Sequence, residues 1–262
     1  MIKAKKSLGQ NFLIDKKILE KITSIENIQD KTVLEVGPGT GNLTSCILKK
    51  KPRKFFIVEK DSNLVINLQK KFHNNLKIIN DDILNINEKK LSTHKLIVFG
   101  NLPYNISTEI LCKWILNLDN EKFWFESLIL MFQKEVADRI IADVNTSNYG
   151  RLSILAKWKL NISKICDINR SSFWPKPKIE STLLIFKPKK KFFKINKATN
   201  IEFITRYFFN HRRKMIKKPF NQLFNGNDEI KRKLRLNLDL RPQNLNLDTY
   251  YNLAKEYENL TS

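Results

Sequence analysis

Three glycines within five residues stand out in a chain of 262 residues that contains only seven glycines. They belong to the segment Glu35-Val-Gly-Pro-Gly-Thr-Gly41, which follows an apolar run and precedes an amphipathic one. Glycine adopts backbone conformations closed to other residues and lets a ligand lie directly against the main chain. The segment therefore predicts a tight strand-to-helix turn that holds a ligand. It is not the dinucleotide fingerprint GxGxxG, because the third glycine position of that pattern carries Asn42.

The spacing of these glycines resembles motif I of the class I S-adenosylmethionine (SAM) methyltransferases. That motif is GxGxG with an acid two residues before the first glycine, which is Glu35 here. The resemblance implies that Gly37, Gly39 and Gly41 bind SAM, whose methionine half carries no phosphate and lies against the backbone. An ordinary strand-to-helix turn without a ligand is the alternative.

Two acids follow the next two apolar runs. Glu59 closes the run 54–59, where an acid can accept hydrogen bonds from both hydroxyls of a ribose. Asp82 follows the run 76–79, where an acid can contact an adenine ring. We expect Glu59 and Asp82 to bind the cofactor. For Asp82 a helix N-cap is an alternative function, and Asp81 is the alternative contact to the adenine.

A second motif, Asn101-Leu-Pro-Tyr104, follows the apolar run 96–99. In an open α/β sheet the carboxyl ends of the strands form the ligand crevice, so this motif and the glycine turn should meet there. An Asn-x-Pro-Tyr sequence at this point resembles motif IV of methyltransferases that modify an exocyclic or amide nitrogen. A Pro-Tyr turn with a buried tyrosine is the alternative.

The residue types of this motif suit methylation of an adenine N6, whose lone pair is delocalised into the ring. The side-chain oxygen of Asn101 and the carbonyl oxygen of Leu102 can accept hydrogen bonds from the two N–H groups. These bonds localise the nitrogen lone pair towards a methyl donor. Pro103 fixes the direction of that carbonyl, and Tyr104 offers a face on which a flipped base can stack. This chemistry needs neither a metal nor a low-pKa base, so positioning and hydrogen bonding carry it.

Short apolar runs that alternate with amphipathic stretches supply the elements that position both motifs. We expect strands at 32–36, 54–59, 76–79, 96–99, 127–132, 152–163 and 181–187. We expect helices at 41–50, 62–73 and 107–117. Strands that alternate with helices predict right-handed βαβ units and a parallel sheet with helices on both faces. The predicted fold class is therefore α/β, a Rossmann-like sheet of the class I SAM-dependent methyltransferase type.

The pattern changes after Pro188. Residues 189–197 are mostly lysine, and from about 199 the periodicity is helical. One face of this predicted helix carries Ile201, Ile204, Phe208 and Met215. Pro219 should end or kink the helix. We therefore expect a SAM-binding catalytic domain at 1–188 and a small helical, basic RNA-binding domain at 189–262.

Six motifs in a fixed order resemble those of one known family. They are Leu8-Gly-Gln-Asn-Phe-Leu13, Glu35-Val-Gly-Pro-Gly-Thr-Gly41, Gly100-Asn-Leu-Pro-Tyr-Asn-Ile-Ser107, Gln133-Lys-Glu-Val136, Tyr149-Gly-Arg-Leu-Ser153 and Phe173-x-Pro-x-Pro-Lys-Ile-x-Ser181. The set resembles the small-subunit (16S) rRNA adenine N6,N6-dimethyltransferases of the KsgA/RsmA type. The resemblance implies dimethylation of two adjacent adenosines in a hairpin loop near the 3′ end of 16S rRNA, with a late role in small-subunit ribosome biogenesis.

By position in these motifs, the resemblance also implies roles for single residues. Asn11 and Leu13 would close over SAM, Gly37 would contact its methionine part, and Asn101 would link the cofactor to the target nitrogen. Phe173 is the expected second wall of the target-base pocket, and a core aromatic is the alternative. The chain departs from the usual family pattern at Trp174 and Lys176, which affects the rim of that pocket.

A net charge of +22, from 48 Lys and Arg against 26 Asp and Glu, indicates a polyanionic partner. The charge is unevenly placed, since 189–218 hold eleven basic residues and one acid whereas 101–150 hold four and seven. The predicted helix carries a basic run after three aromatic residues, and we expect it to bind RNA phosphates. The run consists of Arg212, Arg213, Lys214, Lys217 and Lys218. A solvated helix face is the alternative.

Several classes of protein are disfavoured. No apolar stretch approaches the roughly 18 residues of a membrane span, and the N-terminus lacks the apolar segment of a secretory signal. Three scattered cysteines and three histidines form no zinc spacing, so we expect no metal site and a reducing, cytoplasmic compartment. Nothing indicates an obligate oligomer. We expect a monomer that acts on 16S rRNA within an immature small ribosomal subunit.

Three rival functions remain open at this point. The Erm-type 23S rRNA methyltransferases share the glycine turn and the Asn-x-Pro-Tyr motif, although Gly9 before Gln10 favours the small-subunit enzymes. A ribosome-assembly factor without methylation would explain the basic C-terminal run. A DNA adenine-N6 methyltransferase would use the same chemistry, although the 74 residues after 188 leave little room for a target-recognition domain.

Overall fold

A computed structural model describes residues 4–5, 9–73, 75–120 and 122–261, which form two compact units. Leu8, the first residue of the N-terminal motif, lies outside the described residues. The first unit takes its described residues from 1–113, 123–137 and 162–188. The second unit takes them from 114–122, 138–161 and 189–262. The second unit is therefore larger than the C-terminal domain expected from the sequence.

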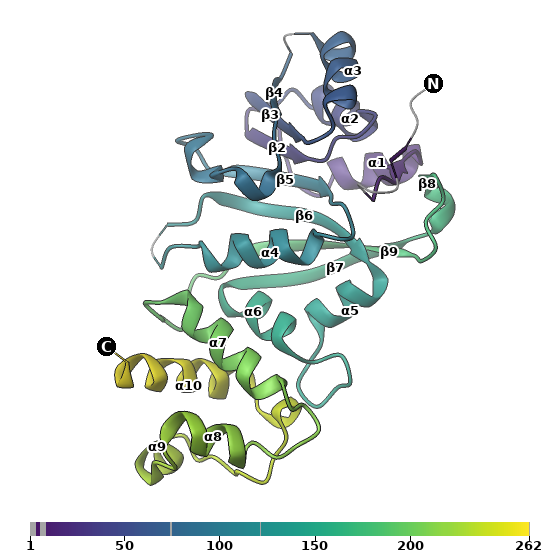
Figure 1. Ribbon diagram of the computed structural model, residues 1–262. Coiled ribbons are helices and arrows are strands. Elements are labelled where there is room, and N and C mark those ends of the chain that lie inside the picture. The colour runs from purple at the N-terminus through teal and green to yellow at the C-terminus, as the bar shows by residue number, and fades with distance from the viewer. Residues whose placement is uncertain (1–3, 6–8, 74, 121, 262) are drawn as a thin grey trace. The chain divides into compact units, whose positions relative to one another are not determined.

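The described strands build a seven-stranded sheet in the order β4-β3-β2-β5-β6-β9-β7 (Figure 1). The strands are β2 (Thr32–Val36), β3 (Lys54–Glu59), β4 (Lys77–Asn80), β5 (Leu96–Asn101), β6 (Phe125–Gln133), β7 (Leu160–Ile168) and β9 (Ser181–Pro188). The five strands from β4 to β6 pair in parallel, as the alternation of strands and helices predicted. Strand β9 pairs with β6 in the antiparallel direction, so the sheet is mixed rather than purely parallel.

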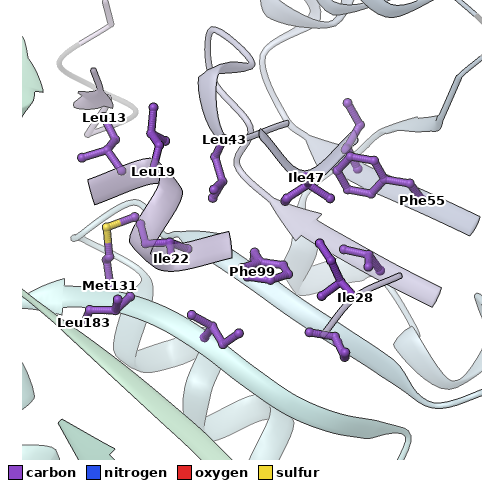
Figure 2. Close-up of a cluster of buried hydrophobic side chains, with 14 of the residues drawn as sticks. Leu13, Leu19, Ile22, Ile28, Leu43, Ile47, Phe55, Phe99, Met131 and Leu183 are labelled. Atoms are coloured by element: carbon purple, nitrogen blue, oxygen red, sulfur yellow. The ribbon is translucent and has the colours of Figure 1, made fainter. Parts of the chain in front are cut away.

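Alternate residues of the strands project from one face of the sheet and form a hydrophobic core with the helices that cover it. The helices that contribute are α1 (Lys16–Thr23), α2 (Asn42–Lys49) and α3 (Ser62–Phe72). Figure 2 shows Phe55, Phe99 and Met131 from the sheet close to Ile22 and Ile47 from the helices. The residues that point to the other face of the sheet, such as Leu34 and Val98, are also fully buried. Burial on both faces explains why these strands are continuous apolar runs in the sequence.

A small ribbon outside this sheet joins the N-terminal segment to a distant loop. Strand β1 (Phe12–Leu13) pairs in the antiparallel direction with β8 (Phe173–Trp174). The pairing sets Phe12 opposite Trp174 and Leu13 opposite Phe173. Two-residue strands carry too little periodicity to be recognised in a sequence, and neither was predicted.

The strand predicted at 152–163 is wrong over most of its length. Residues Arg151–Lys159 form helix α6, and only the last residues of the range belong to β7. Seven of the nine α6 residues are buried, so the helix has no polar face to give its sequence a helical period. Within the second unit, α6 packs against α7 (Ala198–Phe209) and α10 (Leu247–Leu260). This packing explains why the second unit contains 138–161 as well as 189–262.

The helix predicted over the basic run is also wrong. Helix α7 ends at Phe209 and α8 (Lys217–Phe224) begins eight residues later, so 210–216 form a connection between two helices. Ile201, Ile204 and Phe208 are buried on α7 as predicted, whereas Met215 lies in the connection and is 55% exposed. Pro219 lies in the first turn of α8, where its missing N–H costs no helical hydrogen bond.

The remaining α-helices of the described residues are α4 (Ser107–Leu116), α5 (Lys134–Ile141) and α9 (Asp228–Lys233). Over the part of the chain that the structure describes, no helix is both long and apolar enough to cross a membrane.

Candidate functional site

A pocket in the first unit opens where the parallel strands β2, β3 and β5 end. The register aligns these ends, because Val36 pairs with Val58 on one side and with Gly100 on the other. The predicted site residues that line the pocket are Asn11, Leu13, Gly37, Gly39, Glu59, Asp82, Asn101, Leu102, Pro103 and Tyr104. Gly41 and Phe173 are not among the described residues that line it. The topology thus brings together the glycine turn, two acids and the Asn-Leu-Pro-Tyr motif.

The three glycines of the turn all have left-handed backbone angles, but their surroundings differ. At Gly37 an added Cβ would meet only the carbonyl oxygen of Asn101, at 3.5 Å, and the residue lines the pocket. A side chain at this position would therefore occupy pocket space. This is the geometry expected of a glycine that lets a ligand approach the backbone.

Gly39 and Gly41 are constrained by the protein itself. A Cβ on Gly39 would lie 2.6 Å from the Phe12 ring, and a Cβ on Gly41 would lie 2.6 Å from the Phe72 ring. Gly39 still lines the pocket, and its N–H donates to the carboxylate of Glu59 over 3.3 Å. Gly41 packs against α3 instead and is not among the described residues that line the pocket, so its cofactor contact stays a prediction.

Glu35 is fully buried beneath the glycine turn. Its β2 position pairs with Ile57 and Phe99, which places it on the face of the sheet that carries the hydrophobic core. The hydroxyl of Thr44 donates to its Oε2 over 2.6 Å. Burial raises the pKa of Glu35 to about 8, because the charged form loses its hydration.

Glu59 at the end of β3 is held in a fixed orientation. Its Oε1 accepts from the N–H of Asp61 over 2.9 Å, and its Oε2 accepts from the N–H of Gly39. Burial raises the pKa of this carboxyl above its usual value. A carboxylate has about four acceptor positions, so two remain for a ligand with paired hydroxyls. The geometry fits the ribose contact predicted for Glu59.

Asp82 caps a short helix and also lines the pocket. Its Oδ1 caps the short 3-10 helix η2 (Ile83–Asn85) by accepting from the N–H of Leu84, and its Oδ2 pairs with Lys60 at 2.7 Å. Burial raises the pKa of Asp82, but the hydrogen bonds from Lys60 and Leu84 outweigh this and hold the pKa below its usual value. Asp81 also lines the pocket, so both acids lie where an adenine contact was predicted.

The Asn-Leu-Pro-Tyr motif is anchored at both ends. The side-chain nitrogen of Asn101 donates to the main-chain carbonyl of Asn11 over 2.8 Å. A carbonyl oxygen only accepts hydrogen bonds, so the amide nitrogen must face Asn11 and the amide oxygen stays available as an acceptor. The hydroxyl groups of Tyr104 and Ser181 lie 2.6 Å apart, and burial raises the pKa of Tyr104. These bonds fix the amide and the aromatic ring that are expected to orient the target base.

The N-terminal segment is held against the pocket by residues that the sequence analysis did not single out. Asp61 accepts from the Lys5 amine at 2.8 Å and from the Gln10 side chain at 3.0 Å. Asn42 donates from its side chain to the carbonyl of Leu13 over 2.9 Å. Gln10 stands inside one of the six motifs and Asn42 directly follows another, so nearness to a motif was the available signal for them. Asp61 carried no such signal, because an acid before a helix ordinarily indicates only an N-cap.

Phe173 is buried in the hydrophobic core with 2% of its surface exposed. It lies opposite Leu13 in the β1–β8 ribbon, on the side that faces the core. This burial favours the alternative role, a core aromatic, and the target-base contact of Phe173 stays a prediction.

The basic run lies in the second unit, and its five residues do not share the same surroundings. A groove there is lined by Arg213, Lys214, Lys217 and Lys218 together with neighbours that include Met215. Arg212 is engaged elsewhere, since its guanidinium donates to the carbonyls of Thr146 and Ser147 and lies 5.7 Å from the Phe209 ring centroid. Four of the five predicted RNA-binding residues are thus exposed at one groove, whereas Arg212 holds a neighbouring loop.

Comparison with known proteins gives matches over nearly the whole chain. Ribosomal RNA small subunit methyltransferase A of Pelagibacter ubique is 63% identical over 259 residues, which cover 99% of this chain and 98% of that protein. The protein of the same name from Ehrlichia ruminantium is 40% identical, with 97% of each chain covered.

Solved structures give the same picture. A dimethyladenosine transferase from Plasmodium falciparum has a TM-score of 0.77 at 28% identity, covering 95% of this chain and 98% of that one. The 23S rRNA methyltransferase ErmE has a TM-score of 0.68 at 20% identity, covering 94% and 99%, and shares the fold. This likeness confirms the predicted α/β fold of the class I SAM methyltransferases. The model of the family described as ribosomal RNA adenine dimethylase matches residues 1–259. With the pocket geometry and the relatives in agreement, the chain belongs to the ribosomal RNA adenine dimethylase family.

Proposed function

We propose that this enzyme uses SAM to dimethylate N6 of two adjacent adenosines in a hairpin loop near the 3′ end of 16S rRNA. The observation that carries the proposal is the single pocket that joins the open backbone at Gly37 to the amide of Asn101. The names of the bacterial relatives, which specify the small ribosomal subunit, support this choice of RNA.

The residues of the pocket suit SAM along its whole length. The backbone at Gly37 would receive the methionine part, because a side chain there would fill the pocket. Glu59 would accept from the ribose hydroxyls, and Asp82 or Asp81 would contact the adenine. Asn11 and Leu13 would close the site from the N-terminal segment, which Asp61 and Asn42 hold in place. When bound, SAM supplies a methyl group activated by its sulfonium sulfur.

The chain's own contribution is to prepare the adenine nitrogen. The amide oxygen of Asn101 and the carbonyl oxygen of Leu102 would each accept a hydrogen bond from one of the two N6–H groups. These bonds would turn the nitrogen lone pair out of conjugation with the ring. Tyr104, fixed by its contact with Ser181, would stack against the base. Such fixed acceptors in a water-poor site raise the rate by orientation and electrostatic stabilisation.

The second unit supplies the proposed RNA-binding surface. Its groove with Arg213, Lys214, Lys217 and Lys218 would contact phosphates, which a structured RNA presents whatever its sequence. We propose that the enzyme acts as a monomer on an immature small subunit in the cytoplasm. The choice of base would come from the pocket of the first unit.

The direct test is to incubate the protein with methyl-labelled SAM and with immature small or mature large ribosomal subunits. We expect label in the small-subunit RNA and none above background in the large-subunit RNA. Label in the large-subunit RNA alone would instead assign the Erm-type activity. Labelled N6-methyladenine in duplex DNA added as a competitor would assign DNA as the substrate.

A further inference from the structure

A large aromatic side chain that the proposed reaction does not use lies beside the pocket. Trp174 is 47% exposed, which is unusual for tryptophan in a folded chain. Its ring is stacked on Phe12, with the ring centroids 6.4 Å apart and the planes inclined by 22°. Packing in the core does not explain a tryptophan at this exposed position, so a contact with a binding partner is the alternative explanation.

The β1–β8 ribbon determines which way Trp174 faces. Successive side chains of a strand point to opposite sides, so Phe173 turns into the core and Trp174 turns away from it. The same alternation puts Leu13 on the core side and Phe12 on the side of Trp174. The exposure of Trp174 is therefore a consequence of strand geometry and not of an unfolded loop.

Phe12 connects Trp174 to the pocket. Its ring lies against the turn at Gly39, where an added Cβ would come within 2.6 Å, and the residue lines the pocket. Phe12 itself is 6% exposed, so its outer face is covered largely by neighbours that include Trp174. Trp174 thus adds a second aromatic ring outside the Phe12 ring that lines the pocket.

The surroundings of Trp174 combine apolar surface with positive charge. Between residues 170 and 180 the chain carries three exposed cations, Arg170, Lys176 and Lys178, and one carboxylate, Glu180. Ile14 and Ile179 are 48% and 42% exposed. Aromatic side chains next to cations are the usual surface for unpaired nucleotides, because every base has a face that stacks and a phosphate that needs charge.

We propose that Trp174 is a stacking platform for the RNA base next to the adenosine that occupies the pocket. This inference rests on the proposed function, since it takes RNA as the substrate. The target base leaves its stack to enter the pocket, and its neighbour loses a stacking partner in the process. Trp174 replaces that partner at the rim, while Lys176 and Lys178 lie close in sequence to meet the phosphates. Trp174 therefore acts on RNA affinity and leaves SAM affinity unchanged.

The test uses the full chain, immature small subunits and labelled SAM, with methylation rates measured against subunit concentration. Trp174→Leu removes the aromatic face, and Trp174→Phe keeps a smaller one. Ile66→Ala is the matched control, because Ile66 is 49% exposed on α3 and is not part of the ribbon. The dissociation constant for SAM is measured on the same preparations, which also reports whether the Phe12 wall is intact.

We expect Trp174→Leu to raise the KM for subunits about tenfold, a change in the range of one lost base–aromatic stack. Trp174→Phe should stay within about threefold of the wild type, and the SAM dissociation constant should not change in any variant. An unchanged KM for subunits in Trp174→Leu would overturn the inference. So would an equal rise in Ile66→Ala, or a loss of SAM affinity that matches the loss of RNA affinity. Wild-type protein that methylates no subunit would overturn the proposed function as well.

Discussion

The side-chain nitrogen of Asn101 donates a hydrogen bond to the main-chain carbonyl of Asn11, 2.8 Å away. The bond joins the motif that we propose receives the target amine to the N-terminal segment that we propose closes over the cofactor. It also determines which end of the Asn101 amide remains free to accept. The position of the N-terminal segment and the orientation of the Asn101 amide are therefore tied together by one hydrogen bond.

Asn101→Asp tests this relationship. The variant keeps an oxygen acceptor and nearly the same volume, but it replaces the donor to Asn11 with a second acceptor. Two acceptors at this distance repel, so we expect kcat to fall by at least 100-fold and SAM affinity to fall as well. Methylation kinetics and SAM titration measure the two effects. Asn101→Asp with wild-type kcat would show that the amide orientation does not matter.

Gly37→Ala and Gly41→Ala should separate cofactor binding from packing. Both positions have left-handed backbone angles, +68° and +77°, so alanine costs each about 1–2 kcal/mol of stability. Gly37→Ala should add a tenfold or greater loss of SAM affinity, because its Cβ enters the pocket. Gly41→Ala should lose a further 1–3 kcal/mol of unfolding free energy through its clash with Phe72. Equal SAM affinities in the two variants would contradict this division.

Glu35→Gln should change the pH dependence of stability. The pKa of Glu35 rises from its ordinary 4.5 to about 8 in the folded state, so the native state binds the proton more tightly than the unfolded state does. The stability that this proton provides is fully present below about pH 4.5 and is lost as the pH rises through 8. Glutamine stays neutral and can still accept from Thr44. Urea unfolding at pH 5 and pH 8 should therefore show that the unfolding free energy of the variant, relative to that of the wild type, is higher at pH 8 than at pH 5. The same difference in unfolding free energy at both pH values would argue against a buried, protonated Glu35.

The basic residues of the second unit should fall into two classes. Lys217→Gln with Lys218→Gln should weaken RNA binding and reduce the slope of log affinity against log salt by about two. Stability should change by less than about 0.5 kcal/mol, because both residues are exposed at the start of α8. Affinity measured over a series of salt concentrations tests the first expectation. An unchanged slope would exclude these lysines from the RNA interface.

Arg212→Met should behave in the opposite way. It removes the donors to the Thr146 and Ser147 carbonyls, so we expect about 1–2 kcal/mol less unfolding free energy. The salt slope of RNA binding should stay within half a unit of the wild type. A loss of RNA affinity without a loss of unfolding free energy would show that Arg212 binds RNA, as the sequence predicted.

The sequence predicted the parts of the structure that depend on local pattern. Strands 32–36 and 54–59 are apolar because both faces of the sheet are covered, and they form at the predicted residues. The line of Gly37, Glu59 and Asn101 along the strand ends follows from parallel topology alone, which is why the pocket could be predicted.

The differences between the expected and the observed surroundings of several residues have a common physical origin in tertiary packing. Seven of the nine residues of helix α6 are buried, so its sequence lacks a polar face and shows no helical period. Gly41 lies against the Phe72 ring, and Phe173 is packed in the core. Arg212 belongs to a basic run, but a loop more than sixty residues away takes up its donors. In each case the deciding neighbour is distant in sequence.

The most direct test of the central claim is to map methylated adenines in ribosomal RNA by mass spectrometry. The RNA would come from cells that lack this protein, that express it, or that express Asn101→Ala. We predict two adjacent N6,N6-dimethyladenosines near the 3′ end of the small-subunit RNA with the wild type and unmodified adenosines in the other two samples. Dimethyladenosine at those positions with Asn101→Ala, or its absence with the wild type, would contradict the account.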